Sequence, residues 1–363
     1  MDARQRVALA LDHKEPDRVP VDYWATAAVT ARLLDHFGFS SEEQLLQHFD
    51  VDFRYIEGPK YVRPKPEVHH DGSVDDHWGV PRVRVEVNSG GQTSVYHEVI
   101  NFPLRDASSV DQLRDYPKWP DPDWFDYECI ATQVAAARRT GKVVVFMGDR
   151  MNRCAQLKPA MYLRGVDQIL LDLALSPEMA EYLFRKITAF YVEYARRTLE
   201  VAGDGIDIFM TGDDFGAQKG LFMSPEMWRR FLRPGFKAIV ALGRHYGCKV
   251  AHHSCGSIKP IIPDLIDCGL DILNPLQPEV RDMDHGELKR QFGDRLCFHG
   301  SISIQRTLPF GAPDDVRSEV RQRMETLAPG GGFIFCTAHN IQADTPTENI
   351  VALFDAYQDF GRY

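Results

Sequence analysis

Short runs of β-branched and aromatic residues alternate along this chain with longer stretches whose apolar residues have helical spacing. The short runs predict eight strands, at residues 18–24, 51–57, 143–149, 206–213, 249–253, 271–275, 296–300 and 332–339. Apolar residues recur every three or four positions in the stretches that predict helices, among them 177–201, 313–327 and 347–360. Strands that alternate in this way with helices predict an α/β fold, a (β/α)8 TIM barrel, built as a single domain over residues 1–363.

One segment breaks this alternation. Between residues 68 and 101, the runs VPRVRVEV and TSVYHEVI alternate apolar with polar residues, and Ser89-Gly90-Gly91 separates them. A period of two is typical of strands with one covered face, and a glycine-rich turn favours antiparallel pairing. We therefore expect a β-hairpin near residues 68–101, inserted between two units of the barrel.

The predicted strands become polar at their carboxyl ends. In barrels of this class the active site lies at that end, so polar side chains there are candidates for substrate binding. Each candidate also has a structural explanation, such as capping a turn. The residues that we expect to bind substrate are Tyr23, Glu57, Asp149, Gln218, Asn274, His299 and Asn340.

Composition and charge narrow the class of function. A formal net charge of -10 argues against a nucleic-acid-binding surface, because phosphate binding needs clustered Lys and Arg. The amino-terminal segment is too charged for a signal peptide, and no apolar run approaches the ~20 residues of a membrane helix. The seven scattered cysteines fit reduced thiols. We expect a cytoplasmic enzyme that binds neither nucleic acid nor membrane.

Two strand ends carry residues that ligate soft metals. His253 and Cys255 are two positions apart, so their side chains lie on the same side of an extended chain. Cys336 and His339 lie at the end of the last predicted strand, which opens onto the same mouth in a closed barrel. Imidazole and thiolate groups suit zinc, and a three-ligand site leaves one position for substrate. The alternative is a buried cysteine beside a hydrogen-bonded histidine.

Two adjacent carboxylates follow the fourth predicted strand. Asp213 or Asp214 is expected to be catalytic, by orienting substrate or holding a proton. The alternative is a structural pair that caps the next turn through backbone N–H groups. The sequence does not choose between the two residues.

Several long motifs occur in an order that resembles the uroporphyrinogen decarboxylase superfamily over nearly the whole chain. They are ALDHKEPDRVPVDYW (10–24), DHWGV (76–80), GDDFGAQKG (212–220), SPEMWRRFLRPGFK (224–237), HHSCGSI (252–258) and GGFIFCTAHNIQADTP (331–346). The first of them is similar to the methyltransferase-like branch of the superfamily. The arginine-rich segment and the aspartate that handle a tetrapyrrole in true decarboxylases are missing, so the resemblance does not imply porphyrin decarboxylation.

The resemblance to this branch implies a chemistry and a set of partners. Its corrinoid-linked methyltransferases hold zinc with an HxC pair, matched by His253 and Cys255, and with a later cysteine. Aligned on Thr345-Pro346, that cysteine falls at His339, and Cys336 lies slightly earlier, so either residue is a candidate.

The implied reaction is zinc-dependent methyl transfer between a small methylated substrate or thiol and a corrinoid such as methylcobalamin. A separate corrinoid protein and a homodimer are the implied partners. The alternatives are a metal-free decarboxylase or lyase on the same barrel, and a non-catalytic partner of a corrinoid protein.

Overall fold

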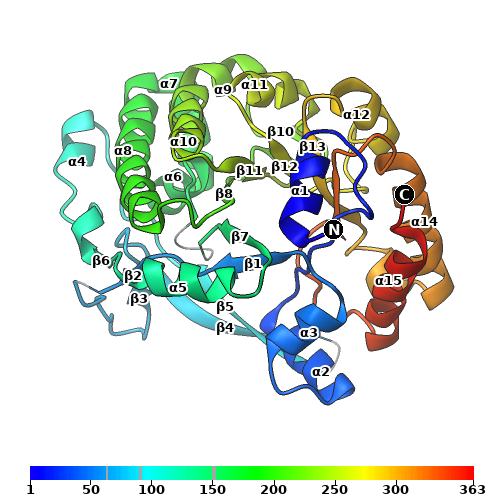
Figure 1. Ribbon diagram of the computed structural model, residues 1–363. Coiled ribbons are helices and arrows are strands. Elements are labelled where there is room, and N and C mark those ends of the chain that lie inside the picture. The colour runs from blue at the N-terminus through cyan, green and yellow to red at the C-terminus, as the bar shows by residue number, and fades with distance from the viewer. Residues whose placement is uncertain (63, 90–91, 149–152) are drawn as a thin grey trace.

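The chain folds around a parallel β-sheet with helices outside it, as the computed structural model of residues 1–62, 64–89, 92–148 and 153–363 shows (Figure 1). The strand order is β1-β7-β8-β11-β12-β13-β14, and every neighbouring pair is parallel. Spatial order follows chain order, which confirms the predicted α/β fold with a parallel sheet. The strands are Phe53–Ile56, Val143–Phe146, Ile208–Gly212, Lys249–His253, Ile272–Asn274, Cys297–Ile302 and Phe333–Thr337.

The first predicted strand, 18–24, is wrong as a regular strand. This segment makes only isolated parallel bridges, Val21 with Phe335 and Ala25 with Ile341. Pro20 has no N–H to give to a ladder, which explains why regular pairing fails here. The segment still joins the two outer strands, because Asp22 N donates to Phe335 O (2.9 Å) and Asp52 N donates to Val21 O (2.9 Å).

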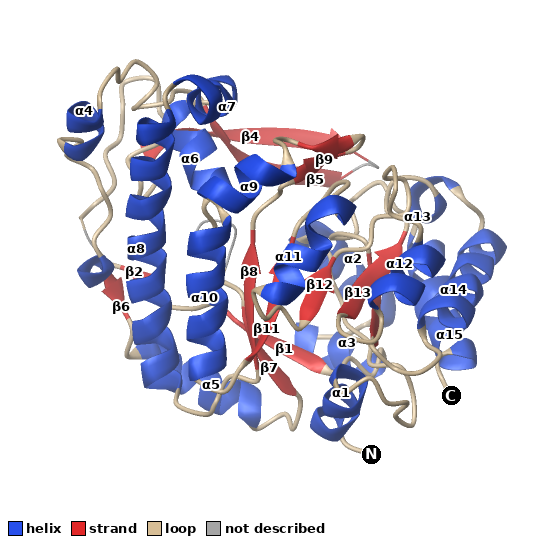
Figure 2. Cartoon of the chain, turned by 90° about the horizontal axis from the view of Figure 1, so that it is seen from above, coloured by secondary structure: helices blue, strands red, loops and turns tan. Residues whose placement is uncertain are grey.

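Helices pack on the outer face of the sheet, and the views in Figures 1 and 2 place α8 and α10 on one side and α14 and α15 on the other. Two predicted helices, 313–327 and 347–360, have the bounds expected, and the third ends one residue later than expected. The helices are α1 Ala3–Leu11, α2 Ala27–Phe37, α3 Glu42–His48, α4 Val110–Arg114, α5 Cys129–Arg138, α6 Leu157–Arg164, α7 Val166–Leu175, α8 Pro177–Ala202, α9 Pro225–Phe231, α10 Arg233–His245, α11 Ile262–Asp267, α12 His285–Phe292, α13 Thr307–Phe310, α14 Pro313–Leu327 and α15 Thr347–Phe360, with 3-10 turns at Pro122–Trp124 and Lys259–Ile261.

Two apolar clusters form the core, one on each face of the sheet. The larger cluster fills the space between the sheet and the helices. The smaller one lies on what we call the inner face, and it takes alternate residues of the strands, including Val143 with Val145 and Ile208 with Met210. Val7 and Leu11 of α1 belong to this inner cluster. Helix α1 therefore covers the inner face near the amino ends of the strands, as Figure 2 also shows.

A three-stranded antiparallel sheet follows β1 in the chain. It consists of β3 (Val74–Asp75), β4 (Pro81–Ser89) and β5 (Gln92–Val99), and Val85 pairs with Tyr96. Residues 90 and 91 of the predicted Ser89-Gly90-Gly91 turn lie outside the described residues. Figure 2 places this sheet at the opposite end of the molecule from α1, and Tyr96 Oη donates to Gln342 Oε1 (3.3 Å) in the loop after β14.

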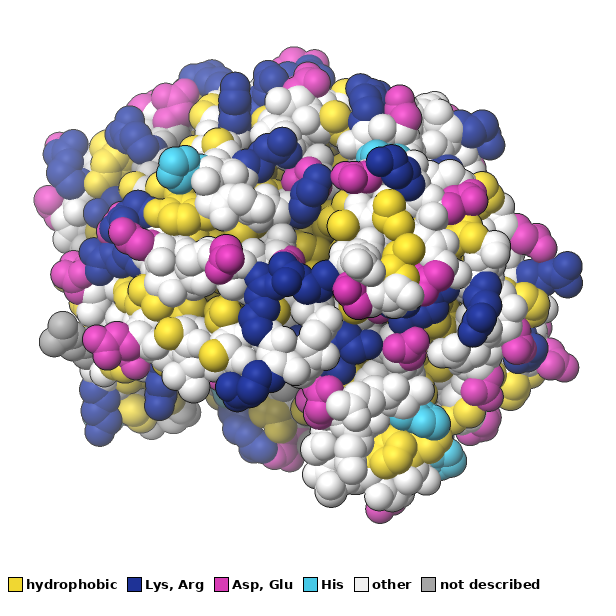
Figure 3. All heavy atoms as spheres, in the orientation of Figure 1, with side chains coloured by type: hydrophobic (Ala, Val, Ile, Leu, Met, Phe, Trp, Pro, Cys, Tyr) yellow, Lys and Arg dark blue, Asp and Glu magenta, His cyan; other side chains and the backbone are white. Residues whose placement is uncertain are grey.

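Two short antiparallel pairs and the outer surface complete the fold. The pairs are β2 (Lys60–Tyr61) with β6 (Phe125–Asp126), and β9 (Gly216–Ala217) with β10 (Gly220–Leu221). On the face seen in Figure 3, acidic and basic side chains are interspersed. Among the described residues, no helix combines the length and apolar character needed to cross a bilayer.

Candidate functional site

Alternation along the strands decides which polar side chains reach the inner face. Ala251, Ile272 and Cys297 belong to the inner cluster. The residues two positions later, His253, Asn274 and His299, therefore share that face; His253 and Asn274 end β11 and β12, and His299 is the third residue of β13. All three are buried. The inner face thus changes from apolar to polar along β11, β12 and β13.

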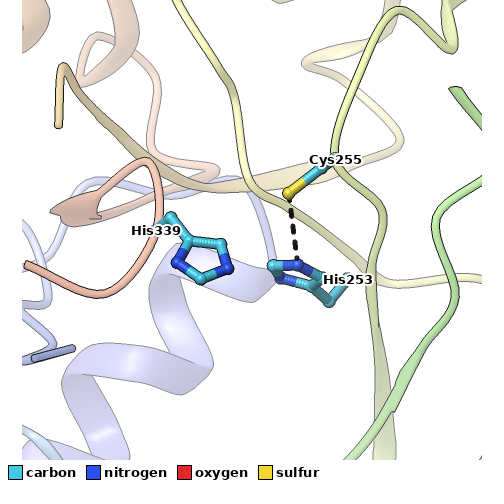
Figure 4. Close-up of side chains that lie close together, drawn as sticks. All are labelled: His253, Cys255 and His339. Atoms are coloured by element: carbon cyan, nitrogen blue, oxygen red, sulfur yellow. Dashed lines mark hydrogen bonds between the residues drawn. The ribbon is translucent and has the colours of Figure 1, made fainter. Parts of the chain in front are cut away.

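Three side chains of types that can bind a metal converge at this end of the sheet (Figure 4). His253 Nε2 lies 3.4 Å from Cys255 Sγ, and the rings of His253 and His339 are 5.6 Å apart. One ligand atom from each of His253, Cys255 and His339 can be chosen so that all three lie within 4.8 Å of one another. His253 comes from β11, Cys255 from the loop after it, and His339 from the loop after β14.

The hydrogen bonding of His253 fits a metal ligand. Its Nδ1 lies 2.6 Å from Asn274 Oδ1, a carbonyl oxygen that can only accept, so Nδ1 carries the proton. The lone pair of a neutral ring is then on Nε2, the atom that faces Cys255. Holding the second ring nitrogen in this way fixes the tautomer and orientation of a metal-binding histidine. Two imidazoles and a thiol form a donor set typical of zinc.

Burial acts against thiolate formation at Cys255 when no cation is near. It raises the pKa of this thiol to about 12, and Asp214 adds to the effect. A bound dication reverses this balance, because a coordinated thiol loses its proton. The residues present therefore fit a zinc ion, which would supply the positive charge that a thiolate at Cys255 needs.

Cys336, the other candidate for the third ligand, lies in a different group. Its Sγ, together with an Asp22 oxygen and a His299 nitrogen, forms a second set within 4.8 Å, and all three residues are buried. Cys336 is on the inner face of β14, whereas His339 lies beyond the end of that strand. The structure thus places His339, rather than Cys336, beside His253 and Cys255.

The two adjacent carboxylates contact different partners. Asp213 is buried, and its carboxylate accepts from the backbone N–H groups of Gln156 (2.7 Å), Leu157 (2.5 Å) and Lys158 (2.8 Å) at the start of α6. Burial raises the pKa of Asp213 to about 6, although these three donors favour the carboxylate. Asp213 therefore caps α6, a helix that precedes it in the chain, whereas the structural alternative was a cap on the turn that follows it.

Asp214 lies beside the three converging ligands. Its Oδ1 accepts from Cys255 N (2.9 Å) and lies 3.9 Å from His253 Nε2, while its Oδ2 lies 2.6 Å from Lys158 Nζ. Burial opposes ionisation, but the charge and hydrogen bond of Lys158 hold the pKa of Asp214 well below its usual range. Asp214 is therefore an anion that anchors the loop of Cys255.

A small cavity of about 30 Å³ lies next to this ion pair. Lys158 and Arg153 provide its cationic wall, and both lower the pKa of the Cys255 thiol against the larger effect of burial. Trp78, between β3 and β4, and Tyr191 of α8 line it as well. The sequence analysis did not identify Lys158 or Arg153, because no motif marks the start of α6 as part of the site.

The predicted substrate-binding residues fall into several places. Asn274 and His299 lie on the inner face, and Asn340 is half-buried next to His339. Glu57 is exposed at the edge of a cleft of about 810 Å³ that Tyr55 and Met147 also line. Gln218 is exposed in the turn between β9 and β10. Asp149 lies outside the described residues.

Tyr23 points away from these groups. Its ring packs on Phe49 and Phe354 in the outer core, and its hydroxyl is 2.9 Å from Thr30 Oγ1. Its neighbours Asp22 and Trp24 occupy the inner side instead, where Trp24 stacks on His253 at 5.7 Å. The alternation of side chains along an extended segment could have identified Asp22 and Trp24 from the sequence, because Tyr23 has the opposite parity.

Comparison with known proteins agrees with this architecture. A methyltransferase from Methanosarcina mazei has a solved structure that superposes with a TM-score of 0.65 over 99% of both chains, at 19% identity. This likeness concerns the fold.

Two curated relatives carry different activities in their names. The methylcobamide:CoM methyltransferase MtaA of Methanosarcina barkeri is 30% identical over 173 residues, which are 47% of this chain and 45% of MtaA. This chain thus matches less than half the length of that relative. A uroporphyrinogen decarboxylase of Coxiella burnetii is 21% identical over 272 residues, which are 72% of this chain and 70% of the decarboxylase.

One family model covers most of the sequence. The model described as uroporphyrinogen decarboxylase (URO-D) matches residues 97–360, a range that contains the whole sheet from β7 to β14 and the three converging ligands. This chain belongs to the uroporphyrinogen decarboxylase family.

Proposed function

We propose that this protein is a zinc-dependent methyltransferase that moves a methyl group between a small methylated substrate or thiol and a corrinoid. The observation that carries the proposal is the convergence of His253, Cys255 and His339 at the carboxyl ends of the strands. The similarity to MtaA, whose name includes methyl transfer from a methylcobamide, supports this direction over porphyrin chemistry.

A zinc ion held by these three residues would act as a Lewis acid that lowers the pKa of a thiol or improves a methylated heteroatom as a leaving group. In thiol methylation, the thiol would release its proton to solvent and its sulfur would form a bond to the methyl carbon. The cobalt–carbon bond of the corrinoid breaks, and its electron pair stays on cobalt. Three protein ligands leave a fourth position for the substrate atom.

The remaining residues of the site position these groups. Asn274 fixes the ring of His253, and Asp214 holds the backbone of Cys255. The Lys158–Asp214 pair lies next to the cavity that Trp78 and Tyr191 line, and these aromatic side chains limit the entry of water. We propose further that residues 20–25 take the eighth strand position of a closed barrel and that the antiparallel insert covers its mouth.

Metal content tests the ligand assignment. We expect the purified protein to hold about one zinc per chain, and the double variant His253→Ala, Cys255→Ser to lose it. His339→Ala should weaken zinc binding, whereas Cys336→Ala should retain the metal. Cys129→Ser, a half-buried thiol outside the cluster, is the control. Full zinc occupancy in the double variant would contradict the proposal.

Turnover separates the proposal from its two alternatives. We expect methyl transfer between free methylcobalamin and a small thiol to depend on Cys255. A decarboxylase or lyase on this fold would instead keep its activity in Cys255→Ser and lose it in Asp214→Asn. A non-catalytic partner would bind a corrinoid protein and show no turnover with free methylcobalamin.

A further inference from the structure

A largely buried polar cluster packs against His253, one of the three converging residues. Asp22 Oδ2 accepts hydrogen bonds from Tyr55 Oη (2.5 Å) and Trp24 Nε1 (3.0 Å), and His299 Nε2 lies 3.2 Å from the same oxygen. Trp24 Nε1 also donates to Tyr55 Oη (2.8 Å). Asp22 Oδ1 accepts from Tyr23 N (2.8 Å). Both oxygens of Asp22 are therefore engaged, which leaves this carboxylate little freedom to ligate an ion.

Trp24 is the member of this cluster that contacts His253. Its indole stacks on the imidazole of His253 with ring centroids 5.7 Å apart and planes 24° from parallel. Its edge packs on His299 at 5.6 Å, and Tyr55 packs against it at 6.2 Å. The indole is thus held by hydrogen bonds at its nitrogen and by rings on its sides.

These contacts restrict the one motion that Asn274 leaves to His253. The bond from Nδ1 to Asn274 fixes one point of the ring, but it still allows the ring plane to tilt. The indole face sets that plane. The face of an indole is also electron-rich, so its attraction for the imidazole increases when a cation draws charge from the ring.

We propose that Trp24, anchored by Asp22 and Tyr55, is a positioning residue that orients His253 for metal binding. This inference rests on the proposed function, because it takes His253 to be a metal ligand. Hydrogen-bonded partners of a ligating histidine typically contribute about 10- to 100-fold to metal affinity, and we expect the stacking contact of Trp24 to contribute at the lower end of that range. Trp24 acts on the metal through His253 and needs no contact with substrate.

Metal titration tests this role without any assay of turnover. We expect Trp24→Leu, which removes the stacking face, and Asp22→Asn, which weakens the anchor of the indole, to bind zinc about tenfold more weakly or worse. Trp24→Phe keeps an aromatic face and should restore part of the affinity. The cobalt(II)-substituted protein should show a shifted d–d absorption spectrum in the Leu and Asn variants, because the ring of His253 is no longer held in place.

The matched control is Trp119→Phe. Trp119 also donates an indole hydrogen bond, to Leu113 O (2.8 Å), but it packs beside Trp78 and Tyr116 away from His253. The Trp119→Phe variant should keep the wild-type zinc affinity and the wild-type cobalt(II) absorption spectrum. Circular dichroism identifies a variant that has failed to fold, and the near-isosteric Asp22→Asn keeps the test decisive if Trp24→Leu does not fold.

The outcomes separate this inference from the function on which it rests. Wild-type affinity and spectrum in Trp24→Leu and Asp22→Asn would overturn the positioning role and leave the proposed function intact. Weakened zinc binding in these variants, together with no methyl transfer by the wild type, would retain the positioning role and overturn the proposed function. A wild-type protein without zinc affinity would overturn both.

Discussion

At the scale of single residues, two neighbouring carboxylates have different tasks. Asp213 accepts three backbone N–H groups at the start of α6, and Asp214 pairs with Lys158 and holds the loop of Cys255. Asp213 thus supports the helix that delivers Lys158 to the site. Asp214 is the carboxylate that remains available for a role beside the substrate.

Asp213→Ala should destabilise the fold because three N–H groups at the buried start of α6 lose their acceptor. We expect a loss of about 2–3 kcal/mol in the free energy of unfolding, measured by urea denaturation. Asp284→Ala is the control, because Asp284 is an exposed cap of α12 that accepts one backbone N–H, from Glu287 (2.7 Å). It should cost about 1 kcal/mol. Equal losses in the two variants would contradict the larger role of Asp213.

The sequence indicates residues of the site where a strand fixes their direction. His253 and Cys255 follow from the spacing at the end of β11, and parity would have favoured Asp22 and Trp24 over Tyr23. The choice between Cys336 and His339 depends on the path of the loop after β14, which no periodicity encodes. Lys158 is brought in by tertiary contacts of α6, so its role becomes visible only in three dimensions.

At the scale of elements, the segment at residues 18–25 lacks regular strand pairing. Side-chain contacts hold it in place instead. Asp52, which is fully buried before β1, accepts from Arg18 Nη1 (2.8 Å), Arg6 Nη1 (2.6 Å) and Val21 N (3.0 Å). One carboxylate thus ties α1, this segment and β1 together. Sequence periodicity identifies the regular strands, but it cannot predict an element held by buried ion pairs.

Asp52→Asn should weaken this junction strongly, because the guanidinium groups of Arg6 and Arg18 lose their buried counter-charge and keep only the more exposed Asp17 and Asp50 as partners. We expect a loss of about 3–5 kcal/mol in the free energy of unfolding. Asp50→Asn is the matched control, since Asp50 pairs with the same Arg18 (2.8 Å) but its side chain is 50% exposed. It should cost less than about 1 kcal/mol. Chemical denaturation of both variants measures the difference, and similar losses would contradict a special role for the buried pair.

At the scale of the whole molecule, stability should depend on pH through buried histidines. Burial lowers the pKa of His285 from 6.5 to about 4, and the nearby charge of Arg323 adds to this effect. The unfolded chain therefore binds more protons than the folded chain between these two values. Stability is then complete above pH 6.5 and falls as the pH drops toward 4.

His285→Gln should reduce the slope of unfolding free energy against pH in this window. Through His285, the free energy of unfolding of the wild type is expected to fall by up to roughly 3 kcal/mol between pH 6.5 and 4. The variant should lack this contribution, so its free energy of unfolding should fall less over the same range. Thermal or urea unfolding at a series of pH values measures the two slopes. Parallel curves for the two proteins would show that His285 does not drive the loss.

Helix α1 leaves the inner face accessible from one end. Val7 and Leu11 cover it near the amino ends of the strands, so a molecule that reaches His253 arrives from the carboxyl ends and departs the same way. Under the proposed function, a bulky corrinoid carrier and a small acceptor would both reach His253 from the carboxyl ends of the strands. We then expect the carrier and the acceptor to bind and leave in a fixed order. The order in which the two reactants bind and are released, more than the affinity for either one, would then govern the turnover rate.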